Sequence, residues 1–582
     1  MRTGRPLTGL AGVVVLSASL LSAPVGSVGQ PPPRDAAGTA AAGFTDITVT
    51  SGIAFRHAAS KTSSKFLPET MGGGVALLDY DGDGRLDIFF TNGAALDAQM
   101  ASARTPDKRQ PRFWNRLYRQ TSEGRFIDVT ETAGLAGHRY DFGVATGDVD
   151  NDGHVDLYVT GYGGNTLYRN RGDGTFVDVT AAAGVAASGW STSAAFVDID
   201  GDGWLDLFVG RYLTWTWEAN VPCPAADSGA RAYCHPRQFP PISNVVFRNN
   251  GDGTFRDVSV TSGVASHPGK ALGVALEDVD DDGDTDVFVA NDSMRQFLFR
   301  NRGDGTFEEV ALAMGIAFDE DGRSFAGMGT DFGDYDGDGR PDLLVTALSL
   351  ERYALFHNDG RDGFTYATHT SGVGPATVRG AGWGTRFLDY DNDGDRDLFV
   401  AQGHVLDTVS KARQGFDYEQ PLLMLRNDRA RFVDASTMMG ASFTKPAAGR
   451  GAAVGDLDND GDLDIVVANL DGAPAVLRND GLAGSRRSLT LRLRGTRSNR
   501  DGIGAVVTLS DDTGRAQRSF ASTASSYQSA SDPRLHIGIG AATAVKVVVR
   551  WPSGATQTVT TLPASGARLI EEPTSTPPPP RP

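Results

Sequence analysis

The chain has 582 residues, of which 40% are hydrophobic and 22% are charged, and its formal net charge is −18 at pH 7. This length and apolar content are sufficient for several domains or one large repeat array. The negative charge argues against binding to the phosphate backbone of nucleic acids or to an anionic membrane surface.

Residues 1–30 have the pattern of a secretory signal peptide. Arg2 and Arg5 precede an apolar stretch over residues 10–21, and small residues follow. This stretch is too short to span a bilayer as a stable helix, and no later segment approaches about 18 consecutive apolar residues. We therefore expect an exported protein without a membrane span, located in the periplasm, at the cell surface or in the medium. Residues 31–43, rich in Pro, Ala and Gly, are expected to form a disordered linker.

An acidic loop at residues 79–87 is the repeating feature of the chain. It has Asp at positions 1, 3, 5 and 9 and Gly at position 6, and near-copies begin at residues 148, 198, 278, 334, 389 and 456. Carboxylates at this spacing, with the backbone carbonyl of position 7, supply the hard oxygen ligands that Ca²⁺ requires, so we expect up to seven calcium ions. The predicted ligands are Asp79, Asp81, Asp83, Arg85 and Asp87; Asp148, Asp150, Asp152, His154 and Asp156; Asp198, Asp200, Asp202, Trp204 and Asp206; Asp278, Asp280, Asp282, Asp284 and Asp286; Asp334, Asp336, Asp338, Arg340 and Asp342; Asp389, Asp391, Asp393, Asp395 and Asp397; and Asp456, Asp458, Asp460, Asp462 and Asp464.

These loops are not EF-hands, because position 12 is Phe or Val where an EF-hand has Glu. Each loop instead leads into an apolar run, such as residues 86–90 or 285–289, that is typical of a β-strand. A strand rich in Gly and Ala precedes each loop, and a further hairpin closes the unit. Seven four-stranded units predict an all-β fold, a seven-bladed β-propeller over residues 44–484, with an open solenoid as the alternative.

Segments such as 141–150, Asp-Phe-Gly-Val-Ala-Thr-Gly-Asp-Val-Asp, resemble the FG-GAP repeat of integrin alpha subunits and the related VCBS repeat of bacterial surface proteins. In those families the repeats form a seven-bladed propeller with calcium in the hairpin loops of one face. The resemblance implies the same fold and metal here, but no particular ligand.

Three insertions interrupt the repeats, at residues 94–113, 211–243 and 404–421. Insertions in propeller loops are where binding specificity is expected, because loops vary while strands cannot. The longest contains Cys223 and Cys234, which are predicted to form a disulfide in an exported protein rather than to remain free thiols. It also contains Trp215 and Trp217, which either anchor the long loop or form an aromatic platform for a carbohydrate or peptide.

The repeat stops near residue 485, and a different β domain is expected over residues 485–571. Four segments, 495–505, 525–529, 535–540 and 551–554, occur in the order seen in the ASPIC/UnbV domain, which this region resembles. Ile537 and Ile539 stand where that pattern usually has Phe and Leu. The family brings no established activity to carry over. Because the domain lacks an acidic loop, we expect it to melt independently of calcium, and we expect residues 572–582 to form an extended proline-rich tail.

The sequence contains no catalytic motif that predicts a reaction. Its nine histidines form no H-E-x-x-H, and there is neither a G-x-S-x-G elbow nor a phosphate loop. Ser529, Asp532 and His536 are close in sequence, but a turn leading into a strand explains them better than a catalytic triad. We therefore predict a calcium-binding protein that adheres to an extracellular protein or glycan. A calcium-dependent polysaccharide lyase and a purely structural or assembly role are the alternatives.

Overall fold

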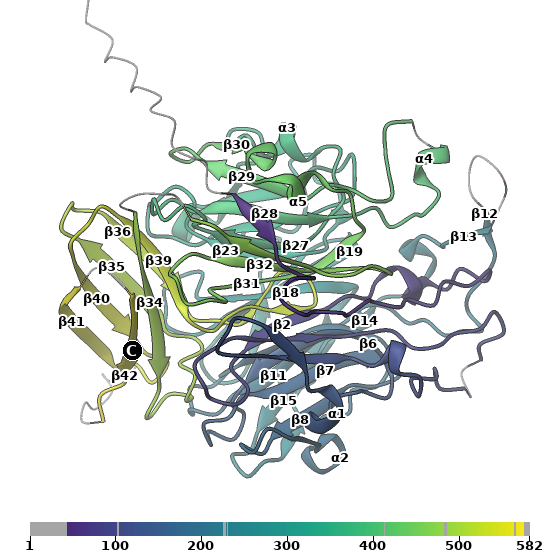
Figure 1. Cartoon of the computed structure of the whole chain (residues 1–582), viewed down its shortest axis with the longest axis horizontal. Helices are drawn as coiled ribbons and strands as arrows, with labels where there is room; N and C mark the ends of the chain where they lie inside the picture. Colours follow the sequence, from purple (N-terminus) through teal and green to yellow (C-terminus); the bar gives the residue numbers. More distant parts are fainter. Residues whose placement is uncertain are drawn as a thin grey trace, which may run out of the picture. The chain divides into compact units, whose positions relative to one another are not determined.

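The structure, a computed structural model, describes residues 43–101, 104–224, 229, 231–412, 414–481, 486–563 and 566–574. β-Strands dominate the regular structure of these residues, as the sequence predicts (Figure 1). The predicted signal peptide, the linker before residue 43 and the tail after residue 574 lie outside the described residues. None of the described helices is long and apolar enough to cross a membrane.

Seven antiparallel four-stranded meanders, which we call repeat sheets 1 to 7, lie within residues 44–479 of the described chain. In hydrogen-bonded order their strands are β2 (Val75–Leu78), β3 (Asp87–Phe90), β4 (Arg116–Gln120) and β5 (Phe126–Asp128); β6 (Tyr140–Gly147), β7 (Asp156–Tyr162), β8 (Thr166–Asn170) and β9 (Phe176–Asp178); β10 (Ser191–Val197), β11 (Asp206–Arg211), β15 (Val245–Asn249) and β16 (Phe255–Asp257); β18 (Ala271–Glu277), β19 (Asp286–Met294), β20 (Phe297–Asn301) and β21 (Phe307–Glu309); β23 (Thr330–Gly333), β24 (Asp342–Val345), β25 (Ala354–Asn358) and β26 (Phe364–Tyr366); β27 (Gly382–Leu388), β28 (Asp397–Gln402), β29 (Leu423–Asn427) and β30 (Phe432–Asp434); and β31 (Gly449–Gly455), β32 (Asp464–Asn469), β33 (Ala475–Asn479) and β1 (Phe44–Asp46).

Shorter elements occupy the connections between these strands. They are the helices α1 (Thr130–Ala133), α2 (Thr180–Ala183), α3 (Val373–Thr377), α4 (Val409–Ala412) and α5 (Ala441–Thr444), and the strands β12 (Cys223–Pro224), β13 (Arg231–Ala232), β14 (Ile242–Ser243), β17 (Pro268–Gly269) and β22 (Phe325–Ala326). Six short 3-10 helices complete the described connections.

The repeat sheets contact one another in cyclic order through their first strands. β2 contacts β6, and the contacts continue through β10, β18, β23, β27 and β31 back to β2. The first and last parts of the repeat region also meet, because β1 pairs with β33 and places Phe44 opposite Asn479. These first strands are rich in small residues because neighbouring backbone approaches them closely. A Cβ on Gly74 would lie 2.4 Å from the carbonyl oxygen of Phe142 on the next sheet.

Residues 486–574 form two further sheets. One contains β39 (Leu535–Gly540), β34 (Arg487–Arg494) and β42 (Gly566–Glu571), and the other contains β36 (Ala516–Phe520), β35 (Val506–Asp511), β40 (Ala544–Arg550) and β41 (Thr556–Pro563). Their inward-facing side chains share a core that includes Leu491, Val507, Ile537 and the fully buried Trp551. This region is drawn in yellow-green in Figure 1.

A segment of this C-terminal region, 523–531, which we call the plug segment, lies against the first strands of the repeat sheets. It contains β37 (Ala524–Ser525) and β38 (Ser529–Ala530), and β38 pairs with β2. Ser526 bonds to Thr330 of sheet 5, Thr385 of sheet 6 and Ala452 of sheet 7. Gln528 bonds to Val144 of sheet 2 and Ser193 of sheet 3.

Val75 of sheet 1 donates to Ser529 over 3.4 Å, and β18 of sheet 4 contacts β37. The plug segment therefore contacts all seven repeat sheets, and all of its residues are buried. The domain boundary predicted near residue 485 gives no indication that the plug segment contacts the repeat sheets.

Candidate functional site

The seven acidic loops connect the first and second strands of the repeat sheets. In the first loop the N–H of Gly84 donates to Asp79 Oδ2 over 3.0 Å, and the N–H of Arg85 donates to Asp83 Oδ1 over 3.0 Å. Gly84 has a φ of +84°, and the position-6 glycine of every other loop is also in the left-handed region. No atom lies within 4 Å of a Cβ built on Gly84, so its backbone conformation, rather than lack of space, favours glycine here.

Position 9 links each loop to the strands below it. Asp87 Oδ2 accepts from the N–H of Tyr80 over 3.2 Å, and its Oδ1 accepts from the N–H of Gln120 on β4 over 2.8 Å. The other six position-9 carboxylates, Asp156, Asp206, Asp286, Asp342, Asp397 and Asp464, make the same two bonds. Position 9 therefore has a structural role in addition to its predicted role as a calcium ligand.

Several carboxylates converge in each loop, and the charge of some is poorly compensated. Single oxygens of Asp79, Asp81 and Asp87 lie within 4.8 Å of one another, as do those of Asp148, Asp150 and Asp156. Buried oxygens Asp79 Oδ1, Asp200 Oδ1 and Asp391 Oδ1 lack a hydrogen-bond donor among the described residues. The convergence of hard oxygens, some without a donor, fits a divalent cation such as Ca²⁺.

Burial also makes the position-9 carboxylates difficult to ionise without a nearby positive charge. Desolvation raises the pKa of Asp87 and of Asp206 to about 8 and that of Asp342 to about 9, although backbone N–H bonds act in the opposite direction. Among the position-1 residues, Asp148 and Asp198 have pKa values raised to about 7, again mainly by burial. A bound cation stabilises the ionised form and would oppose these shifts.

A repeated amide, which sequence analysis did not identify, joins each repeat sheet to the preceding loop. Asn170 Nδ2 on sheet 2 donates to the Tyr80 carbonyl of loop 1 over 2.8 Å, and Asn249 Nδ2 on sheet 3 donates to the Val149 carbonyl of loop 2 over 2.8 Å. Asn301, Asn358, Asn427 and Asn479 make the corresponding bonds in sheets 4 to 7. Gln120 Nε2 of sheet 1 donates over 2.8 Å to the Leu457 carbonyl of loop 7. The Arg-Asn pair that recurs before the closing turn in five of the seven units is the sequence signal that could have identified this residue.

Arginines of the C-terminal region contact four of the loops. Arg550 pairs with Asp278 and with Asp281, the latter over 2.6 Å, in loop 4. Arg486 pairs with Asp391 of loop 6 over 2.6 Å, and Arg534 Nη2 donates to the Asp456 carbonyl of loop 7 over 2.9 Å. Arg500 lies 3.8 Å from Asp148 of loop 2. The loops therefore hold the C-terminal region as well as their own strands.

The three insertions converge on residues 60–70, at the ends of the sheets away from the acidic loops. Ser64 Oγ donates to the Ala98 carbonyl over 2.8 Å, and the Asn220 side chain donates to the Ser64 carbonyl over 2.8 Å. Lys65 pairs with Asp407 over 2.7 Å, and the Tyr233 hydroxyl donates to Glu69 over 3.0 Å. We call these contacting segments, 60–70, 94–113, 211–243 and 404–421, the insertion surface.

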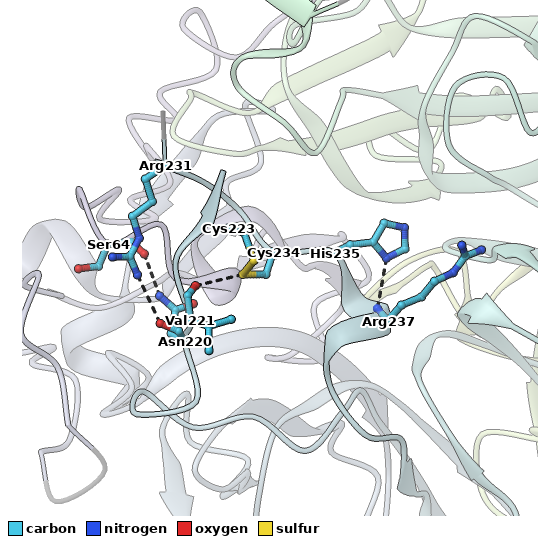
Figure 2. The surroundings of a disulfide bond; sticks show 8 residues. All are labelled: Ser64, Asn220, Val221, Cys223, Arg231, Cys234, His235 and Arg237. Carbon is cyan, nitrogen blue, oxygen red and sulfur yellow. Dashed lines mark hydrogen bonds between the residues drawn. A yellow bond between two sulfur atoms is a disulfide. The ribbon is translucent and has the colours of Figure 1, made fainter. Parts of the chain in front are cut away.

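A disulfide joins Cys223 to Cys234 within the longest insertion, with a Cα–Cα distance of 5.3 Å (Figure 2). Arg231 donates to the Asn220 carbonyl over 3.4 Å, next to the contact between Asn220 and Ser64. The crosslink therefore closes the part of the insertion that contacts residues 60–70.

Trp215 and Trp217 are 5% and 4% exposed, within an aromatic cluster that also contains Phe66, Tyr162 and Trp190. The rings of Trp215 and Trp217 pack edge to face, with centroids 4.9 Å apart, and the Phe66 ring lies 5.0 Å from Trp217. This burial favours the anchoring interpretation of the two tryptophans over an open binding platform.

Ser529, Asp532 and His536, which are close in sequence, make contacts other than those of a catalytic triad. Ser529 Oγ donates to the Tyr527 carbonyl over 2.8 Å, Asp532 pairs with Arg534 over 2.7 Å, and His536 Nε2 lies 2.9 Å from the Gly461 carbonyl. These contacts fit the turn and strand predicted for the segment.

Comparison with known families identifies both parts of the chain. The FG-GAP-like repeat model matches residues 79–159, 148–209, 240–289, 278–345 and 334–400, and the ASPIC and UnbV model matches residues 495–577. Cartilage acidic protein 1 from Homo sapiens is 26% identical over 305 residues, which cover 51% of this chain and 43% of the human protein. The Mus musculus protein is 25% identical over 305 residues, covering 51% of this chain and 44% of its own length. The match thus spans less than half the length of these relatives.

Solved structures give weaker matches. An Agrocybe aegerita lectin that recognises non-reducing terminal N-acetylglucosamine has a TM-score of 0.37 at 16% identity, covering 69% of this chain and 87% of the lectin chain. A structure of YCF48 bound to D1 peptide has a TM-score of 0.38 at 8% identity, covering 70% of this chain and 92% of that chain. The family assignment rests on the repeat and domain matches instead. The chain belongs to the proteins that combine FG-GAP-like repeats with a C-terminal ASPIC and UnbV domain.

Proposed function

We propose that this protein is an exported, calcium-binding, seven-bladed β-propeller that binds an extracellular protein or glycan through its insertion surface. The cyclic contacts of the seven repeat sheets support a closed propeller. The amide bonds between each sheet and the preceding loop support it further, because Gln120 of sheet 1 completes the series at loop 7. A propeller closed in this way leaves no long unpaired sheet edge.

Calcium is the proposed metal of the loops. In each loop, the carboxylates at positions 1, 3, 5 and 9 and the carbonyl at position 7 would hold the ion, which would neutralise a cluster of buried negative charge. Support comes from the converging oxygens and from buried oxygens such as Asp79 Oδ1 that have no donor in the described structure. The ion would thereby stabilise the turns that also carry the arginine contacts of the C-terminal region.

Export is supported by the sequence pattern of residues 1–30 and by the disulfide between Cys223 and Cys234. Disulfides persist in oxidising compartments outside the cytosol. A periplasmic, cell-surface or secreted location is therefore proposed.

The convergence of all three insertions on residues 60–70 is the observation that carries the proposed binding function. Surface loops held by a rigid β scaffold are a common place for binding residues. A pocket of about 420 Å³ beside this surface is lined by Arg56, His57, Lys61 and Arg112, with Asp471 as the acidic residue. The cations Arg56, Lys61 and Arg112, gathered in this way on an acidic protein, favour a partner that presents negative or strongly polar groups.

One cleft beside the loops lacks, among its described residues, the Lys and Tyr that the lyase alternative calls for. A cleft of about 350 Å³ beside loops 6 and 7 is lined by Arg486, Arg487 and Arg534, but within the described chain no Lys, Tyr or His lines it. Lys, Tyr and His are common general bases, and the carboxylates that line this cleft belong to the predicted calcium loops.

A glycan and protein array probed with the tag-free protein, with calcium and with chelator, tests this function. We expect a partner bound in calcium, with binding lost in the Arg56→Ala, Arg112→Ala double variant. The control is Arg302→Ala, which removes an exposed arginine next to the loop-side turn of sheet 4. Equal binding by both variants would place the partner elsewhere, and an absence of binding to any class on the array would argue for the structural alternative.

A further inference from the structure

One position of the third strand differs in repeat sheet 5. The residue immediately before the Asn or Gln that bonds to the preceding loop is histidine in sheet 5, His357 on β25. In the other six sheets it is an arginine: Arg119, Arg169, Arg248, Arg300, Arg426 and Arg478. The register of these strands is the same, since Asn301 faces Phe307 and Asn358 faces Phe364 on the fourth strands. His357 therefore occupies the place of an arginine.

Three of these arginines, Arg169, Arg248 and Arg300, pair with carboxylates of the loops. Arg248 pairs with Asp200 and lies 3.3 Å from Asp202, the position-3 and position-5 residues of loop 3. Arg300 lies 4.0 Å from Asp280 of loop 4. A guanidinium remains protonated in proteins and has no lone pair to offer a metal ion.

His357 directs a nitrogen at the corresponding carboxylates of loop 5. Its Nε2 lies 2.9 Å from Asp336 Oδ2 and 3.6 Å from Asp338 Oδ2, while its Nδ1 lies 3.0 Å from Asp359 Oδ1. A carboxylate that accepts the Nδ1 proton leaves the Nε2 lone pair available, as in many histidine ligands of metals. Asp359 therefore holds the ring in a ligating orientation.

We propose that loop 5 binds a divalent transition metal, of the Zn²⁺ or Co²⁺ class, through His357 Nε2, Asp336 and Asp338. Ligand atoms about 2.0 to 2.2 Å from such a metal lie roughly 3.0 to 3.5 Å apart, which is close to the two separations from Nε2. Imidazole favours these metals, whereas Ca²⁺ takes oxygen ligands. This inference deepens the proposed function. That the loop binds a metal rests on the proposed function, whereas the histidine ligand rests on the contacts of His357 alone.

Loop 5 is open to solvent. Asp336 and Asp338 are exposed, and His357 is half-buried behind them. Asp338 also pairs with the exposed Arg340 of the same loop, which a bound metal would displace. The ion pairs of the C-terminal arginines described above lead instead to loops 2, 4 and 6, and Arg534 bonds to loop 7. A metal at loop 5 can therefore exchange without separation of the C-terminal region.

The test is a Co²⁺ titration of the full, tag-free chain in saturating Ca²⁺, followed by visible absorption and calorimetry. We expect one Co²⁺ equivalent that Zn²⁺ displaces, lost in His357→Arg, which restores the arginine of the other sheets, and in His357→Gln. Asp359→Asn should weaken Co²⁺ binding about tenfold, because it removes the orienting carboxylate. The comparison variant, Arg300→His, places a histidine at the same position of sheet 4, where Arg302 stands in place of Asp359, and should add only a weaker second Co²⁺ site.

Equal Co²⁺ binding by the wild type and both His357 variants would overturn the proposal. If His357→Arg fails to fold, His357→Gln decides. The proposed calcium function fails separately: a chain that binds no Ca²⁺ but retains His357-dependent Co²⁺ binding would refute calcium and leave this site intact. A chain that binds Ca²⁺ in every loop but no Co²⁺ would refute the transition-metal site at loop 5 and leave the proposed calcium function intact.

Discussion

At the scale of single residues, the amide side chains of the third strands add a hydrogen bond between each repeat sheet and the preceding loop. Each is buried, and each donates to a carbonyl of the neighbouring loop while its own N–H binds a position-9 carboxylate. Gln120 is the one glutamine in this series, at the junction of sheets 7 and 1.

Gln120→Ala is expected to lower the free energy of unfolding by about 1 to 3 kcal/mol, because it leaves the buried Leu457 carbonyl without its donor. Urea unfolding in calcium measures the change. Asn250→Ala, at an exposed position, is the control and should alter stability by less than about 0.5 kcal/mol. Indistinguishable unfolding curves for the two variants would show that the amide contributes little to this junction.

His57, which lies on the side of the sheets away from the acidic loops, is expected to make the stability of the fold depend on pH. It is buried, and its Nδ1 accepts from the N–H of Asp471 over 3.3 Å. Burial lowers its pKa to about 4; Asp471 opposes the shift, while nearby Lys108, Arg450 and Lys61 reinforce it. The fold therefore favours neutral histidine, and the unfolded chain binds the proton more readily between pH 4 and about 6.5.

We expect His57 to reduce stability as pH falls from about 6.5 through 4, by about 3 kcal/mol at most. His57→Gln should remove this part of the acid destabilisation, whereas His138→Gln, at a half-exposed site, should not. Urea unfolding in calcium between pH 4 and 7 gives the difference. Parallel pH profiles for the wild type and His57→Gln would contradict the prediction.

At the scale of elements, the long insertion is stabilised by a disulfide and by an aromatic cluster. Trp217 packs against Phe66 and Tyr162, which come from two other parts of the chain. The insertion is thus held at one end by Cys223 and Cys234 and at the other by buried rings. This arrangement positions a loop surface without requiring the tryptophans to contact a partner.

Trp217→Ala should destabilise the protein by about 3 to 5 kcal/mol, because a large buried ring is lost from the aromatic cluster. The double variant Cys223→Ala, Cys234→Ala should lower the free energy of unfolding by about 2 to 3 kcal/mol, because the disulfide no longer restricts the unfolded chain. Thermal and urea unfolding measure both, and the intact mass should be two hydrogens lighter than the reduced chain. A Trp217→Ala variant of unchanged stability would instead support the platform interpretation.

At the scale of the whole molecule, the plug segment joins the C-terminal region to the repeat sheets. Tyr527 is fully buried, donates its hydroxyl proton to the Met71 carbonyl over 2.7 Å and packs against Trp383. The independent melting expected from the sequence does not fit these contacts. Unfolding the repeat sheets would expose the plug segment, so the two regions should unfold together.

Removal of calcium is expected to lower the melting temperature of the whole chain by more than about ten degrees in one transition. At millimolar calcium each extracellular-type site contributes about 0.4 to 1.4 kcal/mol, and seven sites contribute several-fold more. Calorimetry with and without chelator, together with metal analysis, checks this. Superimposable traces and no bound calcium would refute the metal assignment, and a separate unchanged C-terminal transition would refute the coupling.

The repeat itself was predictable from the sequence because its signals are local. Gly84 and its counterparts need a left-handed backbone, and apolar runs such as 86–90 need burial, so loops and strands follow from short segments. The same local chemistry carried the prediction of acidic oxygens brought together at each loop. The all-β class and the family follow from these repeated short patterns.

Only the tertiary structure decided which distant segments meet. The bond from Gln120 to Leu457 joins residues 337 positions apart, and the plug segment reaches all seven sheets from the far end of the chain. Ser526 looks like an ordinary polar turn residue in the sequence, yet it is buried, and backbone groups of sheets 5, 6 and 7 supply its partners. Gln528 is buried as well: its backbone bonds to Val144 and Ser193, while its side-chain amide has no hydrogen-bond partner among the described residues. Such partners depend on packing across the whole fold, so spacing and composition along the chain do not reveal them.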